Sequence, residues 1–111
     1  MPFWVYQVPR EKILEVSRKL ETLAKPNIRF TITTVEGPWT VITTGFSRSE
    51  YGRVFVEIED LRYHGLATYE LDKQTGRFEI TDADFPYPLE FEILKQKLGI
   101  NVDEFKLLRA G

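Results

Sequence analysis

The residue of this 111-residue sequence best suited to acid–base catalysis is its only histidine, His64. Imidazole is the side chain whose ordinary pKa lies nearest to neutrality, so His64 could serve as the general base of a hydrolase, assisted by nearby acidic residues. Tyr63 and Arg62 stand beside it in the chain. A histidine in a polar turn is more often an exposed surface residue, and we expect that simpler role here.

Two groups of carboxylates raise the possibility of a metal site or of a glycosidase-type carboxylate pair. Glu79, Asp82 and Asp84 offer the hard oxygen ligands that Mg²⁺ and Ca²⁺ prefer, but they lack the glycine and the distal glutamate of a calcium loop. Glu57 and Glu59 would stand about 6.5 Å apart on one face of a strand, within the range of glycosidase carboxylate pairs. Turn capping and cross-strand pairing with arginine are the simpler roles. We therefore expect no metal site.

Several classes of chemistry are excluded by residues and motifs that the sequence lacks. It has no cysteine, so disulfides, thiolate catalysis and cysteine-ligated zinc are excluded, and a single histidine excludes a multi-histidine metal site. Neither the G-x-S-x-G nucleophile motif nor a glycine-rich phosphate loop occurs. We expect no cofactor, and we favour a non-enzymatic role.

The aromatic residues favour a binding role, because eight Phe, five Tyr and two Trp are many for a chain of this length. Some of them should lie on the sheet face opposite the helices, where Trp, Tyr and Arg are typical of interfaces. The residues predicted for this face are Trp4, Tyr6, Arg29, Thr31, Thr33 and Phe55. We expect them to bind a partner protein or a second copy of the chain.

Two other interpretations of these residues remain. Aromatic side chains and arginine on an open sheet also stack the bases of single-stranded nucleic acid. The net charge of -2 opposes that function, because neutralising phosphates dominates nucleic-acid affinity. Alternatively, loops or the last helices cover the same aromatic residues, which would then form a second layer of core.

The elements that must position these residues begin with a strand and a helix. Phe3–Val8 combines aromatic and β-branched residues without charge, which predicts a strand. Pro9–Ala24 has apolar residues at helical spacing, with Pro9 suited to the first helical position. Pro26 ends this helix, since the residue before a proline avoids helical geometry.

An antiparallel meander follows the helix. Alternation predicts strands at Ile28–Thr33, Trp39–Phe46 and Arg53–Asp60, with a polar loop at Gly45–Gly52. The last hairpin pairs residues 66–71 with residues 77–81. Its turn, Asp72–Gly76, suits a type I turn followed by a left-handed glycine.

The end of the chain has the pattern of two helices. Leu89–Leu98 carries apolar residues on one side and is followed by Gly99, which suits a helix end. Asn101 with Glu104 three residues later is typical of a helix start, so Phe105, Leu107 and Leu108 should pack as a short last helix.

These elements together predict the α+β class. We expect an antiparallel sheet of about five or six strands, one N-terminal helix after strand 1 and two C-terminal helices, mainly on one sheet face. Residues 1–111 should form a single domain, since no linker or repeat interrupts them.

The whole-chain composition indicates a heat-adapted protein of the cytoplasm. Met occurs only at position 1, while twelve Glu, seven Lys and eight Arg provide most of the charge. The charge shifts along the chain, from six basic against three acidic groups in residues 1–35 to four against seven in residues 79–111. Neither a signal peptide nor an apolar run long enough to span a membrane is present, so we expect no membrane association.

Overall fold

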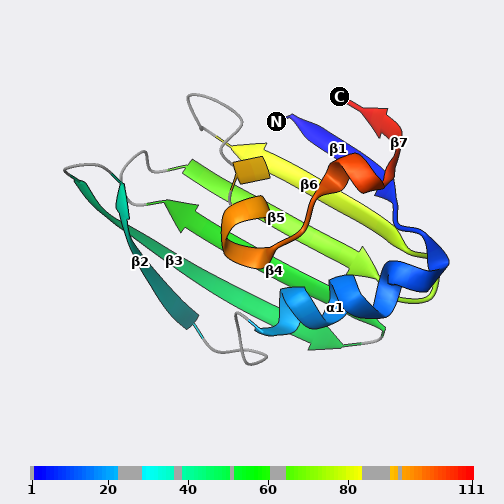
Figure 1. The fold of residues 1–111 in the computed structure, drawn as a ribbon, viewed down its shortest axis with the longest axis horizontal. Coiled ribbons are helices and arrows are strands. Elements are labelled where there is room, and N and C mark those ends of the chain that lie inside the picture. Colours follow the sequence, from blue (N-terminus) through cyan, green and yellow to red (C-terminus); the bar gives the residue numbers. More distant parts are fainter. Residues whose placement is uncertain are drawn as a thin grey trace.

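The computed structural model describes residues 2–22, 29–36, 39–50, 52–60, 65–83, 91–92 and 94–111, with the backbone alone at residues 22, 29–36, 39–50, 60, 82–83 and 97. An antiparallel sheet with the strand order β2-β3-β4-β5-β6-β1-β7 organises the chain (Figure 1). The strands are β1 (Phe3–Gln7), β2 (Arg29–Glu36), β3 (Trp39–Glu50), β4 (Arg53–Asp60), β5 (Gly65–Asp72), β6 (Arg77–Ala83) and β7 (Lys106–Ala110). The predicted α+β class with an antiparallel sheet is confirmed.

The first strand lies inside the sheet. β1 pairs with β6 on one side and with β7 on the other, so the two ends of the chain are neighbours (Figure 1). Its register places Trp4 opposite Ile80 and Tyr6 opposite Phe78. Because paired residues of an antiparallel ladder point to the same face, this register decides which side of the sheet each β1 residue occupies.

The predicted N-terminal helix is confirmed. A 3₁₀ turn, η1 (Arg10–Lys12), follows Pro9 and leads into α1 (Ile13–Thr22). Val16 and Leu20 are buried at helical spacing and anchor α1 to the sheet. Within the described residues, no helix has both the length and the apolar character needed to cross a membrane.

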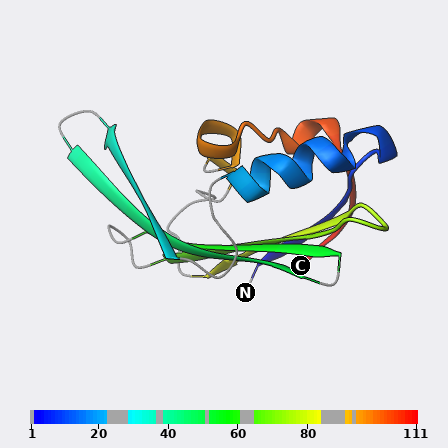
Figure 2. The same cartoon turned by 90° about the horizontal axis from the view of Figure 1, so that it is seen from below.

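The core fills the space between the sheet and the helical segments, which lie together on one side (Figure 2). Every second residue of the central strands points into it, as the alternating burial of β5 shows. Tyr69 stacks on Phe78 with ring centroids 6.5 Å apart, and Phe105 meets the Phe78 ring edge-on at 6.3 Å. One apolar face of the sheet is thereby covered, and none of the described helical segments lies on the other face.

The hairpin between β5 and β6 turns as the sequence predicts. Gly76 has a φ of +78° and donates its backbone N–H to the Asp72 carbonyl at 2.8 Å. The Asp72 carboxylate accepts hydrogen bonds from the backbone N–H groups of Gln74 and Thr75, at 2.9 and 3.2 Å. Its carboxylate therefore holds the turn that glycine makes possible.

The prediction of two C-terminal helices is wrong. Phe91 and Glu92 are helical, and η2 (Leu94–Leu98) forms a π-helical turn, but η3 (Val102–Glu104) is a single 3₁₀ turn. Asn101 caps that turn by accepting from the Asp103 N–H at 3.1 Å, as a helix start would. The chain then becomes extended at Phe105, whose ring enters the core, and β7 pairs with β1 instead of continuing a helix.

The prediction of a polar loop at Gly45–Gly52 is also wrong for most of these residues. β3 continues to Glu50 and pairs with β4, with Ser47 opposite Val56 and Glu50 opposite Arg53. A backbone ladder satisfies the hydrogen bonds of a polar segment as well as those of an apolar one, so polarity alone did not mark a loop. At their far end, β2 and β3 rise on the same side of the sheet as the helices (Figure 2).

Candidate binding surface on the open sheet face

The sheet face without helices presents a mixed set of side chains. On β4, Val54, Val56 and Ile58 are buried in the core, while the alternate residues Phe55 and Glu57 are partly exposed on the open face. The same alternation along β5 and β6 puts charged residues on this face. Phe55 and Glu57 therefore stand where the sequence predicts.

Trp4 and Tyr6 lie on the other face, so the prediction that they share the open face with Phe55 is wrong. Trp4 packs against the core and meets the Phe91 ring edge-on, with centroids 4.8 Å apart. Tyr6 is 8% exposed and belongs to the core cluster. The reason is the register of β1, which aligns these two residues with the buried face of β6.

The remaining predicted surface residues, on β2, are described by their backbone only. Arg29 pairs with Phe46, and Thr31 pairs with Thr44. Phe46 and Thr44 in turn pair with Glu57 and Glu59 of β4. The backbone positions of Arg29 and Thr31 are thus in line with open-face positions of β4.

Thr33 pairs with Ile42, outside the part of β3 that pairs with β4. Nothing is described of the side chains of Arg29, Thr31 and Thr33.

The predicted catalytic and metal-binding groups are only partly covered by the described residues. His64 and Asp84 lie outside them, and Asp82 is described by its backbone alone. The backbone of Asp82 pairs with that of Ala67, and Glu79 lies on the open face. Among the residues whose side chains are described, no three acidic or histidine side chains are arranged to hold a metal ion.

A shallow hollow of about 190 Å³ lies on the open face, across β4, β5, β6, β1 and β7, and we call it the charged hollow. It is lined by Val5, Arg53, Glu70, Asp72, Arg77, Glu79 and Arg109. Three of these side chains are cationic and three are anionic, so the surface carries both signs without a net charge.

The charges of this hollow are incompletely paired. Arg53 lies 3.6 Å from Glu70, in an ion pair whose side chains are 62% and 44% exposed. Glu79 stands directly opposite Glu70 in the ladder, an arrangement of like charges that costs stability. Neither Arg77 nor Glu79 has an ion-pair partner among the described side chains.

Apolar and aromatic contacts form the other side of the hollow. Val5 is 4% exposed although it lies on the open face, with Glu79 and Arg109 as its cross-strand neighbours. The long side chains on either side shield it from water. The Arg109 guanidinium lies over the Phe3 ring, 5.5 Å from its centroid, which holds that charge at the edge of the hollow.

Asp72 is the fixed anion of the hollow. The hydrogen bonds from Gln74 and Thr75 lower the pKa of its carboxyl below the ordinary value, and the positive charge of Arg53 adds to this effect. Asp72 is therefore ionised at neutral pH and is committed to its turn, so the charges available to a partner are mainly those of Arg77 and Glu79.

Sequence reasoning finds part of this site and misses the rest. Glu79 enters the sequence-based predictions only as one of three grouped carboxylates, and Arg77 is not placed on the predicted surface. Alternation within residues 77–81 is the signal that could have placed both on one face, but their lack of partners is a tertiary property. Arg109 is missed because its segment consists mainly of strong helix formers.

No protein-family model matches the chain, and searches of curated proteins and of solved structures return no match.

Proposed function

We propose that this protein is a non-enzymatic interaction module that associates with a second copy of itself through the charged hollow. The observation that carries the proposal is the pair Arg77 and Glu79, which lie two residues apart on one strand face without ion-pair partners among the described side chains. A two-fold symmetric interface must be complementary to itself. An axis passing between these two residues would bring Arg77 of each copy against Glu79 of the other.

The charge balance of the surface supports a second copy over a strongly charged partner. Three cations and three anions line the hollow, so two copies need not repel each other. Face-to-face packing of two sheets is a common way to cover an open face. A different protein with mixed charge is the other partner of the same class.

Single-stranded nucleic-acid binding is less well supported. Its proposed stacking residues Trp4 and Tyr6 are on the helix-bearing face, while Phe55 is on the open one. The carboxylates of Glu70 and Glu79 on the open face would repel phosphates. Hydrolysis by His64 has no described geometry to support it.

The composition supports a further proposal about habitat. The abundance of Glu, Lys and Arg, with methionine only at position 1, fits a heat-adapted protein of the cytoplasm. A heat-adapted protein is expected to have a melting temperature well above the roughly 45–65 °C of mesophilic domains.

Sedimentation velocity across a range of protein concentrations tests the self-association. We expect the wild-type chain to form a dimer whose fraction rises with concentration and falls with added salt, because salt screens exposed charges. Glu79→Lys should raise the dissociation constant of the dimer about tenfold or more. In this variant Arg77 of each copy faces a lysine at position 79 of the other, so like charges repel.

Arg18→Glu is the matched control, because Arg18 is an exposed residue of α1 outside the charged hollow. It should leave the dimer unchanged. A wild-type chain that remains monomeric at every concentration, or a dimer equally strong in Glu79→Lys, would overturn the proposal.

A further inference from the structure

A second hollow lies on the opposite side of β1, next to the C-terminal segment. Its volume of about 310 Å³ is within the range of small-molecule sites. It is lined by Tyr6, Phe91, Lys95, Ile100, Asn101, Val102 and Asp103, and we call it the Tyr6 hollow. Its position separates it from the charged hollow, which lies on the open face of the sheet.

The buried residue of this hollow that lacks a partner is Tyr6. Tyr6 as a residue is 8% exposed, and its hydroxyl has no hydrogen-bond partner among the described residues. Because Tyr6 lines the hollow, its hydroxyl is free to donate a hydrogen bond to a group that enters the hollow from outside the protein fold. Burial raises the pKa of the Tyr6 phenol, and the negative charge of Asp103 raises it further. Tyr6 is therefore a protonated donor at neutral pH.

The surrounding residues define the chemistry of a complementary ligand. Phe91, Ile100 and Val102 provide an apolar surface. Ile100 is the most buried of the three, with 2% of its surface exposed. Lys95 is exposed at the rim and adds a cation to the donor of Tyr6. Asp103 is an exposed anion of the same rim, which disfavours ligands with two negative charges.

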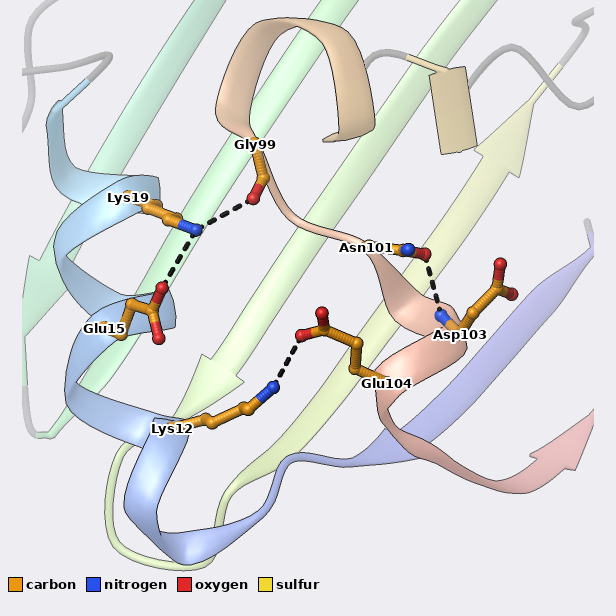
Figure 3. A network of polar contacts seen from close by, with 7 residues as sticks. All are labelled: Lys12, Glu15, Lys19, Gly99, Asn101, Asp103 and Glu104. Atoms are coloured by element: carbon orange, nitrogen blue, oxygen red, sulfur yellow. Dashed lines mark hydrogen bonds and ion pairs between the residues drawn. The ribbon is translucent and has the colours of Figure 1, made fainter.

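One wall of the hollow is held in place from η1 and α1 (Figure 3). The Lys19 ammonium donates to the carbonyl of Gly99 at 2.9 Å, at the point where the chain turns with a φ of +66°. Lys12 and Glu104 form an ion pair at 2.7 Å at the other end of the Ile100–Asp103 segment. Such contacts fix the wall before a ligand arrives, which lowers the entropic cost of binding.

We propose that the Tyr6 hollow binds a small monocarboxylate with a flat apolar body. The carboxylate accepts a hydrogen bond from the Tyr6 hydroxyl and interacts with the ammonium of Lys95. The flat body contacts Phe91, Ile100 and Val102. Lys12 and Lys19 do not touch the ligand and act as positioning residues for the wall.

The test is a titration of the full ¹⁵N-labelled chain with sodium benzoate, followed by amide chemical shifts. Benzoate should cause saturable shifts in β1 and in residues 99–103. Benzylamine and phenyl phosphate serve as probes with the opposite charge and with two negative charges, and both should bind at least several-fold more weakly. Tyr6→Phe should weaken benzoate binding about tenfold, the effect of a hydrogen bond to a charged group.

The variants are chosen so that folding and binding can be separated. Tyr6→Phe removes a hydroxyl without a described partner, so its melting temperature should not fall. Lys95→Gln should weaken benzoate binding about threefold, and Arg18→Gln, outside the hollow, should not change it. The proposal is overturned if benzoate causes no saturable shifts, if benzylamine binds better, or if folded Tyr6→Phe binds benzoate as well as wild type. None of these results depends on dimerisation.

Discussion

At the scale of single residues, two glycines with the same backbone conformation differ in what surrounds them. Gly76 and Gly52 have φ values of +78° and +73°. A Cβ on Gly76 would lie 2.8 Å from the Val8 carbonyl oxygen, whereas a Cβ on Gly52 would meet nothing closer than the Gln74 side chain at 3.9 Å. The β5–β6 hairpin therefore requires glycine at position 76 for two reasons, whereas position 52, between β3 and β4, requires it for one.

Alanine substitutions separate these two reasons. Gly52→Ala should lower the free energy of unfolding by about 1 kcal/mol, the cost of a left-handed backbone. Gly76→Ala should lower it by about 3 kcal/mol, because displacement of the backbone around Val8 adds to that cost. Urea denaturation measures both, and equal losses for the two variants would contradict the close approach at Gly76.

The carboxyl of Asp72 gives the stability a pH dependence of definite sign. Its pKa is lowered in the folded chain, so it stabilises the fold above its unfolded-state pKa near 4, and that contribution is lost as the pH falls through the folded value. Asp72→Asn keeps an oxygen acceptor but does not titrate. Its urea midpoint should therefore fall less than that of wild type between pH 5 and pH 2.

Glu104 must be separated from Asp72 in this measurement. Lys12 lowers the pKa of Glu104 through their hydrogen bond, so both carboxyls contribute with the same sign. In Lys12→Met the larger part of the Glu104 contribution is removed, leaving only the weaker effect of Lys19, and the Asp72→Asn difference should persist. If Lys12→Met and the double variant Lys12→Met with Asp72→Asn lose stability in parallel on acidification, the role given to Asp72 is wrong.

At the scale of elements, local patterns predict the first part of the fold better than its end. Aromatic and β-branched residues without charge identify β1, alternation identifies β4, the turn at Asp72–Gly76 identifies the β5–β6 hairpin, and helical spacing identifies α1. β7 is not predictable in this way, since its residues are all exposed and it has no apolar alternation. Its pairing with β1 joins the two ends of the chain, a contact that no short window of sequence contains.

A pair of substitutions distinguishes the strand from the predicted helix. In a helix, Phe105 and Leu108 would be three residues apart on the same buried side. In the structure Phe105 is 9% exposed and packs on Phe78, while Leu108 is 40% exposed. Phe105→Ala should cost about 3 kcal/mol of unfolding free energy and Leu108→Ala less than about 1 kcal/mol, measured by urea denaturation. Similar large losses would favour the helix.

The candidate site divides in the same way between local and tertiary information. Glu57 and Phe55 are placed correctly by alternation within one strand. Trp4 and Tyr6 are misplaced because the side they occupy depends on the pairing of β1 with β6, which sequence patterns leave open. A shift of one residue in such a register would exchange the two faces of the strand.

At the scale of the whole molecule, the sheet separates two surfaces with different chemistry. The helical segments lie on one side of the sheet (Figure 2). That side contains the core and the Tyr6 hollow, and the open side carries the charged hollow. A chain that dimerises through its open face would leave the Tyr6 hollow accessible. The two proposals are therefore independent, and each is tested without the other.

The most direct test of the self-association is the sedimentation of a charge-swapped chain. Arg77→Glu with Glu79→Lys exchanges the two charges within one copy, so a two-fold interface that pairs position 77 with position 79 keeps its complementarity. We predict that Glu79→Lys alone is mainly monomeric and that the double variant recovers the wild-type dimer. A double variant that stays as monomeric as Glu79→Lys would contradict the pairing of Arg77 with Glu79 between copies.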